Sequence, residues 1–378
     1  MPALVGIRRM DMQPGVPRMR IGQIGVWGFG GYRRQKIRES GLFDLIAVCD
    51  RNPEATAAAA REENARACAN FDELLATPGL EGVVISTGAD SHAELMIKAL
   101  DAGLHVFCEK PLCATTEQTL EILAAERRSG KKAVIGFAHP EDNRVRRTVQ
   151  RLAANGELGT LAAYQSDSSH SGGLQIKPGE WRGQRGRNPG GNLFQCGVHS
   201  LYLLQDLFGP VVGVSALMRY DVNKKTQTAD VTSLLLRHES GMVGTMNCYH
   251  VTAYFHELRV FGDVANAYID THLCQGTLQK NLKGPVEPRV PLTLDAPACA
   301  DLTGNLRSWF RAVREGEAPS PSVVDAARVM AIVFAADRSS EERREVSPDE
   351  VLPVSTGVKT TPTITVEPKL RPLAAKDH

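Results

Sequence analysis

Residues 21–50, IGQIGVWGFGGYRRQKIRESGLFDLIAVCD, decide the fold. They begin with a short apolar run, continue into Gly28, Gly30 and Gly31, and end on Asp50, twenty residues after Gly30. A strand, a glycine turn, a helix and a second strand that ends on a carboxylate form a unit that binds a dinucleotide. The sequence therefore predicts that Gly28 makes the tight turn and that Gly30 lets the backbone approach a pyrophosphate at the helix N-terminus.

The residues beside this turn predict which dinucleotide it binds. Asp50 can accept hydrogen bonds from the adenosine ribose hydroxyls and repels a 2′-phosphate, which favours NAD, whereas Arg51 beside it leaves NADP open. The third small residue of a G-x-G-x-x-G pattern that starts at Gly28 falls on Arg33. We therefore expect Arg33 or its neighbour Arg34 to contact a phosphate.

Composition sets the broad class of protein. The chain has 378 residues, enough for two domains. It has 44 Lys and Arg against 43 Asp and Glu, so no general basic field exists to hold nucleic acid or an anionic membrane.

Its 8 cysteines form no C-x-x-C pair, the spacing expected of a zinc site or a redox motif. His250 and His256 lie on neighbouring predicted strands without a third ligand, so no metal site is predicted. Because no signal peptide or membrane span is evident, we expect a cytoplasmic protein.

Two patterns of secondary structure follow one another along the chain. Strands and helices alternate up to about residue 138, which predicts a doubly wound parallel sheet. A long Gly-rich loop at 168–191 and a helix at 192–207 come next, followed by four or five strand-like runs with short turns. The runs, which predict an α+β domain with a largely antiparallel open sheet, lie at 211–220, 231–238, 242–251, 257–261 and 265–270. The predicted organisation is a flexible arm at 1–18, a Rossmann dinucleotide-binding domain at 19–138, a substrate-binding and oligomerisation domain at 139–349, and an extended or disordered tail at 350–378.

The triplet Glu109-Lys110-Pro111 directly follows a predicted strand at 105–108. Open α/β sheets bind their ligands at the carboxyl ends of the strands, so the Lys110 ammonium would stand beside a nicotinamide. A lysine whose pKa is lowered by burial can exchange a proton with an alcohol. The alternative for a lone Glu-Lys pair is a salt-bridged lysine on the surface.

The predicted helix at 192–207 carries a second candidate group. Gln195 and His199 are four residues apart, so a regular helix presents both on one face. An imidazole can exchange a proton with a substrate hydroxyl near neutral pH, while a Gln amide orients it by hydrogen bonds. The alternative for a single helical histidine is a structural role.

The Gly-rich loop at 168–191 carries three arginines. Arg182, Arg185 and Arg187 could clamp a carboxylate or phosphate of the substrate. A solvated basic loop is an equally weighted alternative.

Together these segments resemble the Gfo/Idh/MocA oxidoreductase family over about residues 19–345. The resemblance is carried by the glycine turn with Asp50, by STGADSH at 86–92, by EKP at 109–111, by WR at 181–182 and by GGNLFQCGVH at 190–199. It implies that Lys110 and His199 serve catalysis and that Thr87 and His92 line the cofactor site. It also implies a substrate site near Trp181.

Three positions depart from the family pattern. Gln195 replaces the usual acid of D-x-G-x-H, Tyr202 replaces the acid three residues after the histidine, and Gly88 replaces a proline. Without that acid, proton transfer falls on Lys110 and His199. The resemblance implies an NAD(P)-dependent dehydrogenase or reductase acting on the CH–OH group of a sugar, sugar acid or cyclitol. The alternatives are a redox-cycling, NAD-dependent glycoside hydrolase or lyase of the same family, and a non-catalytic nucleotide-binding sensor.

The predictions for site and assembly are as follows. A homodimer or homotetramer is expected, because the outer face of the antiparallel sheet should be too apolar to remain exposed. The predicted catalytic residues are Lys110, His199 and Gln195. The predicted substrate contacts are Trp181, Arg182, Gln195 and His199. The predicted cofactor contacts are Gly28, Phe29, Gly30, Gly31, Asp50, Arg51, Thr87, His92, Glu109 and Lys110.

Overall fold

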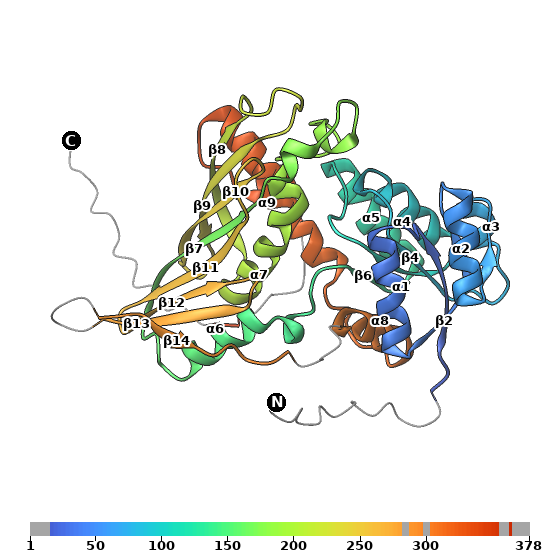
Figure 1. The fold of residues 1–378 in the computed structure, drawn as a ribbon, viewed down its shortest axis with the longest axis horizontal. Coiled ribbons are helices and arrows are strands. Elements are labelled where there is room, and N and C mark those ends of the chain that lie inside the picture. The colour runs from blue at the N-terminus through green and yellow to red at the C-terminus, as the bar shows by residue number, and fades with distance from the viewer. Residues whose placement is uncertain (1–15, 282–286, 298–302, 355–362, 365–378) are drawn as a thin grey trace. The chain divides into compact units, whose positions relative to one another are not determined.

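The computed structural model describes residues 16–281, 287–297, 303–354 and 363–364 (Figure 1). It has two compact units. Unit 1 comprises Met1–Leu112, Leu120–Asp142 and Ala296–Val323, and unit 2 comprises Cys113–Thr119, Asn143–Asp295 and Val324–His378. Most of the predicted N-terminal arm and C-terminal tail, at 1–15, 355–362 and 365–378, lies outside the described residues.

Unit 1 contains the predicted parallel sheet. All neighbouring strands pair in parallel, in the order β3-β2-β1-β4-β5-β6, so the doubly wound fold is confirmed. The strands are β1 Met19–Ile24, β2 Phe43–Cys49, β3 Arg66–Ala67, β4 Gly82–Ile85, β5 His105–Cys108 and β6 Ala133–Ile135. The helices that connect them are α1 Phe29–Ser40, α2 Pro53–Glu63, α3 Phe71–Leu75, α4 His92–Asp101 and α5 Thr116–Ser129.

A helix from far along the chain completes the core of unit 1. Helix α8, Gly304–Arg314, places the fully buried Trp309 ring 5.3 Å from Phe43 and 5.9 Å from Phe107. Gly82 on β4 makes room, because a Cβ there would lie 2.9 Å from the indole. This differs from the predicted domain at 139–349, which contained α8. An amphipathic helix shows its apolar face in the sequence, but not which sheet covers it.

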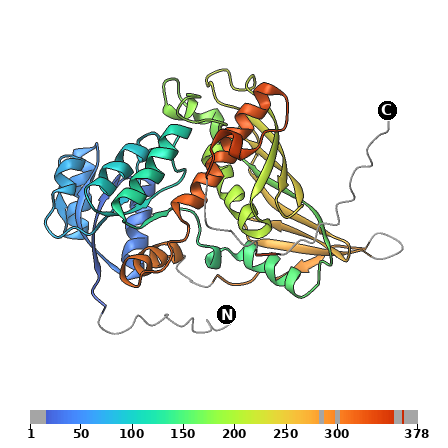
Figure 2. The same ribbon diagram turned by 180° about the vertical axis from the view of Figure 1, so that it is seen from behind.

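Unit 2 contains the predicted largely antiparallel sheet, in the order β14-β13-β12-β11-β7-β10-β9-β8, with one parallel pair, β7 with β10. The C-terminal half of α9 runs along the edge strand β8, where the hydroxyls of Ser339 and Ser340 accept the N–H groups of Ala216 and Met218 (Figure 2). The strands are β7 Leu161–Ser169, β8 Val211–Arg219, β9 Val231–His238, β10 Val243–Tyr249, β11 Phe255–Gly262, β12 Ala265–Asp270, β13 Gln275–Lys280 and β14 Val290–Leu292. The helices of the unit are α6 Arg144–Ala154, α7 Val198–Phe208, α9 Val323–Glu342 and α10 Pro348–Val351.

A buried polar pair lies in the core of unit 2. The His238 ring is 2 % exposed, with Nδ1 2.7 Å from the Gly209 carbonyl oxygen and Nε2 2.8 Å from the Tyr164 hydroxyl. Burial raises the pKa of Tyr164, so its hydroxyl keeps its proton and donates to Nε2, while Nδ1–H donates to Gly209. Burial also lowers the pKa of His238 to about 4, so the ring is neutral in the folded protein.

This histidine predicts a loss of stability in mild acid. The pKa of His238 is 6.5 in its unperturbed state and about 4 when folded, so over this range the unfolded chain binds a proton that the folded chain excludes. The free energy of unfolding should therefore fall as pH falls, by up to about 1.4 kcal/mol per pH unit from this group. Thermal unfolding of the wild type and of His238→Gln, followed between these two pH values, measures it. His238→Gln should be less stable than the wild type at neutral pH, but its free energy of unfolding should fall less steeply as the pH falls. Equal slopes in the two proteins would contradict the assignment of this pH dependence to His238.

Candidate cofactor and catalytic site

The glycine turn of unit 1 lies between β1 and α1. Gly25 has φ 81°, and a Cβ on it would lie 2.6 Å from the Ser86 carbonyl oxygen, so the tight turn at the strand end requires glycine there. A Cβ on Gly30 would lie 2.1 Å from the Gly25 carbonyl oxygen, so the helix packs on the strand end through Gly30. Gly31 is different, since its nearest neighbour would be 3.8 Å away.

Gly28 directly precedes α1 and has φ 58°, so it makes a turn that favours glycine, as the sequence predicts. The third position of a pattern that starts at Gly28 is the buried Arg33, so the departure at that position remains. The contact of Gly28 and Gly30 with a pyrophosphate stays a prediction. Trp27, directly before Gly28, has a side chain that is 79 % exposed. Phe29, also predicted to contact the cofactor, is 55 % exposed beside it.

The two arginines predicted to touch a phosphate have other partners. Arg34 pairs with Glu62 at 2.7 Å and with Glu63 at 3.0 Å, both on α2. Arg33 is buried and pairs with Glu109 at 2.7 Å. The prediction of a phosphate contact is therefore wrong for this structure. The sequence did not reveal this because a buried arginine and a surface arginine look alike in a short helix.

Asp50 is held beside the glycine turn at the end of β2. Its Oδ2 accepts the Val26 N–H at 2.8 Å, and its Oδ1 accepts the Asn52 N–H at 3.0 Å. These bonds fix the carboxylate, and each oxygen keeps a lone pair for a ligand hydroxyl. Arg51 beside it is exposed. The predicted contact between Asp50 and the ribose fits this geometry and remains a prediction.

Substituting Asp50 should change cofactor preference. Asp50→Ala removes both the predicted ribose acceptor and the charge that repels a 2′-phosphate, so NAD should bind more weakly and the preference over NADP should shrink. One good charge-assisted hydrogen bond corresponds to about 1.5–3 kcal/mol, or roughly a 10- to 150-fold loss. Fluorescence titration with NADH and NADPH measures both effects. The control is Asp44→Ala, which removes an exposed carboxylate on the same strand that pairs with Arg18 at 3.4 Å. Wild-type protein that binds NADPH as tightly as NADH would overturn the role of Asp50.

His92 is an internal support instead of a cofactor ligand. The ring is 1 % exposed, with Nδ1 2.7 Å from the Pro111 carbonyl oxygen and Nε2 3.3 Å from that of Thr87. Burial lowers the pKa of His92, so the neutral ring donates one proton, on the shorter side, to Pro111. His92 thus joins the segments of Thr87 and Pro111. The predicted contact of its side chain with the cofactor is replaced by this role.

Glu109 and Lys110 follow β5 but lie in different environments. Glu109 donates its N–H to Ile85 at 2.9 Å, and its carboxylate is buried against Arg33. Its side chain therefore points into unit 1, which corrects the predicted cofactor contact. Lys110 is half-buried at the carboxyl end of β5, the sheet edge where open α/β folds bind ligands. Thr87, half-buried at the end of β4, occupies the same edge, with its hydroxyl 2.7 Å from that of Ser91.

Gln195 and His199 belong to unit 2. Gln195 lies in a π-helical turn, Leu193–Gly197, and His199 lies in the first turn of α7, so the regular helix predicted over 192–207 is wrong at its start. The wider π turn changes the alignment assumed for residues four apart, and such turns are frequent at functional sites. Gly197 packs on the sheet, since a Cβ there would lie 2.7 Å from the Cys248 sulfur. Gln195 is half-buried and His199 is exposed.

The π turn lies beside a group of imidazoles that the sequence did not bring together. We call this group the histidine cluster; its members are His170, Cys196, His250, Tyr254, His256 and His272. The Cys196 sulfur is 3.4 Å from Nε2 of His170, whose ring centre lies 5.0 Å from that of His250. Tyr254 stacks on His256 at 4.4 Å, and its hydroxyl is 3.1 Å from Nδ1 of His272.

The buried imidazoles of the histidine cluster are neutral. Burial lowers the pKa of His250 and of His256 to about 4. Nδ1 of His170 accepts the Gly172 N–H at 2.9 Å, so its proton is on Nε2 and faces Cys196. Within the described part of the chain, no group of three or more His, Cys, Asp or Glu residues could hold a metal ion. A neutral imidazole offers a donor and an acceptor, which suits hydroxyl groups better than anions.

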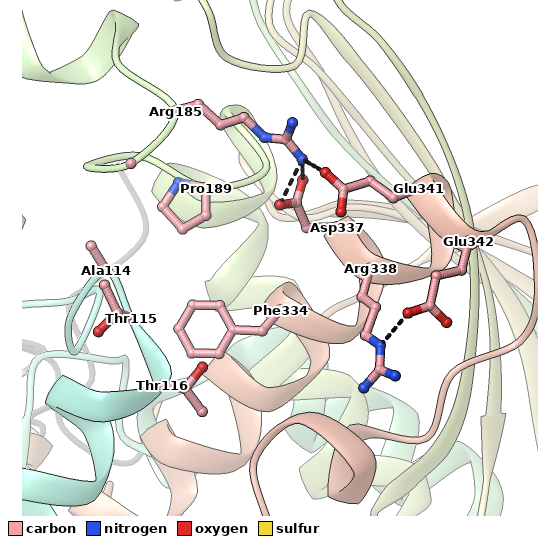
Figure 3. Close-up of a pocket in the computed structure, with 11 residues that line it drawn as sticks. Ala114, Thr115, Thr116, Arg185, Pro189, Phe334, Asp337, Arg338, Glu341 and Glu342 are labelled. Carbon is pink, nitrogen blue, oxygen red and sulfur yellow. Dashed lines mark hydrogen bonds and ion pairs between the residues drawn. The ribbon is translucent and has the colours of Figure 1, made fainter.

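An open cavity of about 650 Å³ lies in unit 2 between the Gly-rich loop and α9 (Figure 3). Arg185 reaches across its rim and pairs with Asp337 at 2.9 Å and with Glu341 at 2.5 Å. Arg185 therefore anchors the loop to α9, which corrects its suggested role as an anion clamp. Arg185 lines this cavity, but the predicted catalytic residues Lys110, Gln195 and His199 do not. Arg182 is exposed, with its guanidinium 4.7 Å over the Trp181 ring.

Comparison with known proteins identifies the class of protein. Residues 19–137 match the profile described as an oxidoreductase family with an NAD-binding Rossmann fold, and residues 146–267 match the GFO/IDH/MocA C-terminal domain. The chain belongs to the Gfo/Idh/MocA oxidoreductase family. It is accordingly an NAD(P)-dependent dehydrogenase of CH–OH groups with an NAD-binding Rossmann domain.

Several proteins that are similar to this chain are named dehydrogenases. The chain is 35 % identical to inositol 2-dehydrogenase of Ralstonia nicotianae over 145 residues, 36 % of this chain and 42 % of that protein. It is 25 % identical to D-apiose dehydrogenase of Paraburkholderia graminis over 80 % of this chain and 82 % of that protein. Levoglucosan dehydrogenase in complex with NADH has a similar fold, with a TM-score of 0.78 at 18 % identity over 88 % of this chain and 99 % of that chain.

Within the described residues, none of the helices has the length and apolar character needed to cross a membrane.

Proposed function

We propose that this protein moves a hydride between NAD and a hydroxyl-bearing carbon of a neutral sugar or cyclitol. The observation that carries the proposal is the position of Lys110, half-buried at the carboxyl end of β5 in the sheet that holds the glycine turn and Asp50. The names of the relatives support the substrate class. A sugar acid is the less favoured substrate, because Arg185 is engaged by two carboxylates and the buried imidazoles are neutral.

Each proposed residue has a defined task. NAD, which the glycine turn and Asp50 would hold, would supply the acceptor for the hydride. Lys110, as the neutral amine, accepts the hydroxyl proton as the carbonyl forms, and as the ammonium it returns the proton in the reverse direction. His199 is the second proton-transfer group, and Gln195 orients a hydroxyl through its amide. Trp181 and Arg182 are the proposed substrate contacts on the loop.

The histidine cluster extends this proposal to the substrate. Its neutral imidazoles and the Tyr254 hydroxyl provide donors and acceptors beside the turn that carries Gln195. His256 Nε2 is buried and has no hydrogen-bond partner among the described residues, so it can serve a ligand hydroxyl. We infer that this cluster recognises ring hydroxyls of the substrate.

A substrate panel tests the proposed function. Sugars, sugar acids, cyclitols and nucleotide sugars are supplied with NAD, and reduced nicotinamide and products are both measured. Turnover of a neutral polyol with one NADH formed per carbonyl is the expected outcome. A product formed without accumulation of NADH would identify redox cycling, and binding of NADH without any product would identify a sensor. Gln195→Asp restores the usual family acid, so a changed pH profile in this variant supports contact of residue 195 with the reacting hydroxyl.

We also propose that the protein is a homo-oligomer that pairs through the outer face of the unit 2 sheet. Adjacent strands β8, β9 and β10 expose Leu217 to 77 %, Leu235 to 61 % and Val243 to 46 % on the same face. Further along the sheet that face is polar, with Glu257 and Arg259 paired on β11. A dimer or tetramer by light scattering at micromolar concentration is expected, and a monomer would overturn this.

A further inference from the structure

A buried ion pair joins the helix of the glycine turn to the strand end that carries Lys110. Arg33 on α1 and Glu109 after β5 are each 4 % exposed. Nε and Nη2 of Arg33 both lie 2.7 Å from Oε1 of Glu109. The guanidinium also lies over the Phe107 ring, 4.7 Å from its centre. The pair therefore has a fixed geometry inside unit 1.

The residue before Lys110 is held by its backbone as well as by this pair. Glu109 donates its N–H to Ile85 on β4 at 2.9 Å, and Gly136 donates to Cys108 at 2.7 Å. Glu109 Oε2 packs against Gly136, where a Cβ would lie 2.6 Å away, and has no hydrogen-bond partner among the described residues. Half of the carboxylate is thus unsatisfied, so the pair is poorly explained as a stabilising interaction. A buried pair of this kind is often no more stable than apolar side chains of the same volume.

We propose that Arg33 is a positioning residue for Lys110, acting through Glu109. The pair anchors the strand end to α1, whose first turn directly follows Gly28, and it places a balanced pair of charges next to Lys110. A nearby titratable group is His92, whose pKa is lowered mainly by burial, while the charge of Glu109 acts to raise it and that of Lys110 to lower it. The proposal rests on the proposed proton-transfer role of Lys110.

Three variants test this proposal. Glu109→Gln leaves the Arg33 charge uncompensated, the double variant Arg33→Met with Glu109→Gln removes both charges, and Arg34→Met is the matched control. Arg34 is the neighbouring arginine of α1, also paired with carboxylates, but its partners lie on α2. Each variant is assayed for NADH affinity, for kcat and KM, and for the pH dependence of Lys110 acylation by an amine-reactive reagent, followed by peptide mass spectrometry. The acylation assay needs no substrate.

The expected outcomes separate positioning from stability. In Glu109→Gln the pH for half-maximal acylation of Lys110 should fall by about one unit, because an unbalanced cation disfavours the ammonium. In the double variant that pH should return towards the wild type, while kcat falls by about tenfold and NADH affinity changes by less than about threefold. Arg34→Met should change none of these quantities.

Two results would overturn the proposal. One is an unchanged Lys110 acylation profile in folded Glu109→Gln, and the other is a double variant with wild-type kcat and wild-type acylation rates. If Glu109→Gln does not fold, the double variant alone decides, because it buries no uncompensated charge. If the wild type binds NADH but turns over no substrate, the proposed function fails, while the acylation profiles and rates still decide whether the pair controls Lys110.

Discussion

Lys110→Met should lower turnover on the true substrate by about 10²- to 10⁴-fold, the range typical for loss of a positioned proton-transfer group. Methionine has a similar length and no charge, so the half-buried site at the end of β5 should stay filled. NADH affinity should remain within a few-fold of the wild type, because the glycine turn and Asp50 are untouched. Steady-state kinetics and NADH titration measure the two quantities separately.

Lys98→Met is a suitable control for this experiment. Lys98 lies on α4, is 43 % exposed and pairs with Asp72, so its removal should leave turnover unchanged. His199→Ala should reduce turnover less severely than Lys110→Met. If both groups serve one step, the double variant will be far less impaired than the product of the single effects. Near-normal turnover of Lys110→Met would place the active site elsewhere.

Gly30→Ala should disrupt the dinucleotide site, whereas Gly31→Ala should not. A methyl group on Gly30 would lie 2.1 Å from the Gly25 carbonyl oxygen, so either α1 or the end of β1 must move. Overpacking of this kind costs about 1–3 kcal/mol or more, and displacement of the first turn of α1 should weaken NADH binding at least tenfold. Thermal unfolding and NADH titration measure both losses.

Gly31→Ala is the control for Gly30→Ala. A methyl group on Gly31 has its nearest neighbour at 3.8 Å, and alanine favours a helix over glycine by up to about 1 kcal/mol. Gly31→Ala should therefore be as stable as the wild type or more stable, with unchanged NADH affinity. Equal losses in both variants would contradict the close packing of α1 on the end of β1 through Gly30.

Much of the fold could be predicted from the sequence because it depends on local patterns. The parallel sheet follows from buried apolar runs that alternate with helices, and the predicted strands at 105–108, 231–238 and 265–270 agree with β5, β9 and β12. Strands β13 and β14 were missed, because their sequences, QGTLQK and VPL, lack a clear apolar alternation. These two strands form by pairing, β13 with β12 and β14 with β13, and the local sequence does not show this pairing.

The site was predicted less completely, because it depends on contacts between distant residues. Position along the chain placed Lys110 at a strand end, but it could not show that Glu109 faces inward to Arg33, 76 residues away. The spacing of the glycines also could not show that Gly30 packs against the Gly25 carbonyl oxygen, whereas Gly31 has space for a methyl group. The histidine cluster brings together residues from 170 to 272, which no spacing rule would connect.

Helix α8 belongs to unit 1 but follows most of unit 2 in the sequence, so the order of synthesis affects when the core of unit 1 is completed. The ribosome produces residues 143–295, that is 295 − 143 + 1 = 153 residues of unit 2, before the segment with Trp309 appears. At about 5–20 residues per second this takes roughly 8 to 30 s. During that time the pocket for the indole beside Phe43, Phe107 and Gly82 has no occupant. The nascent unit 1 then exposes an apolar surface to chaperones. Its core is completed only after most of unit 2 has left the ribosome.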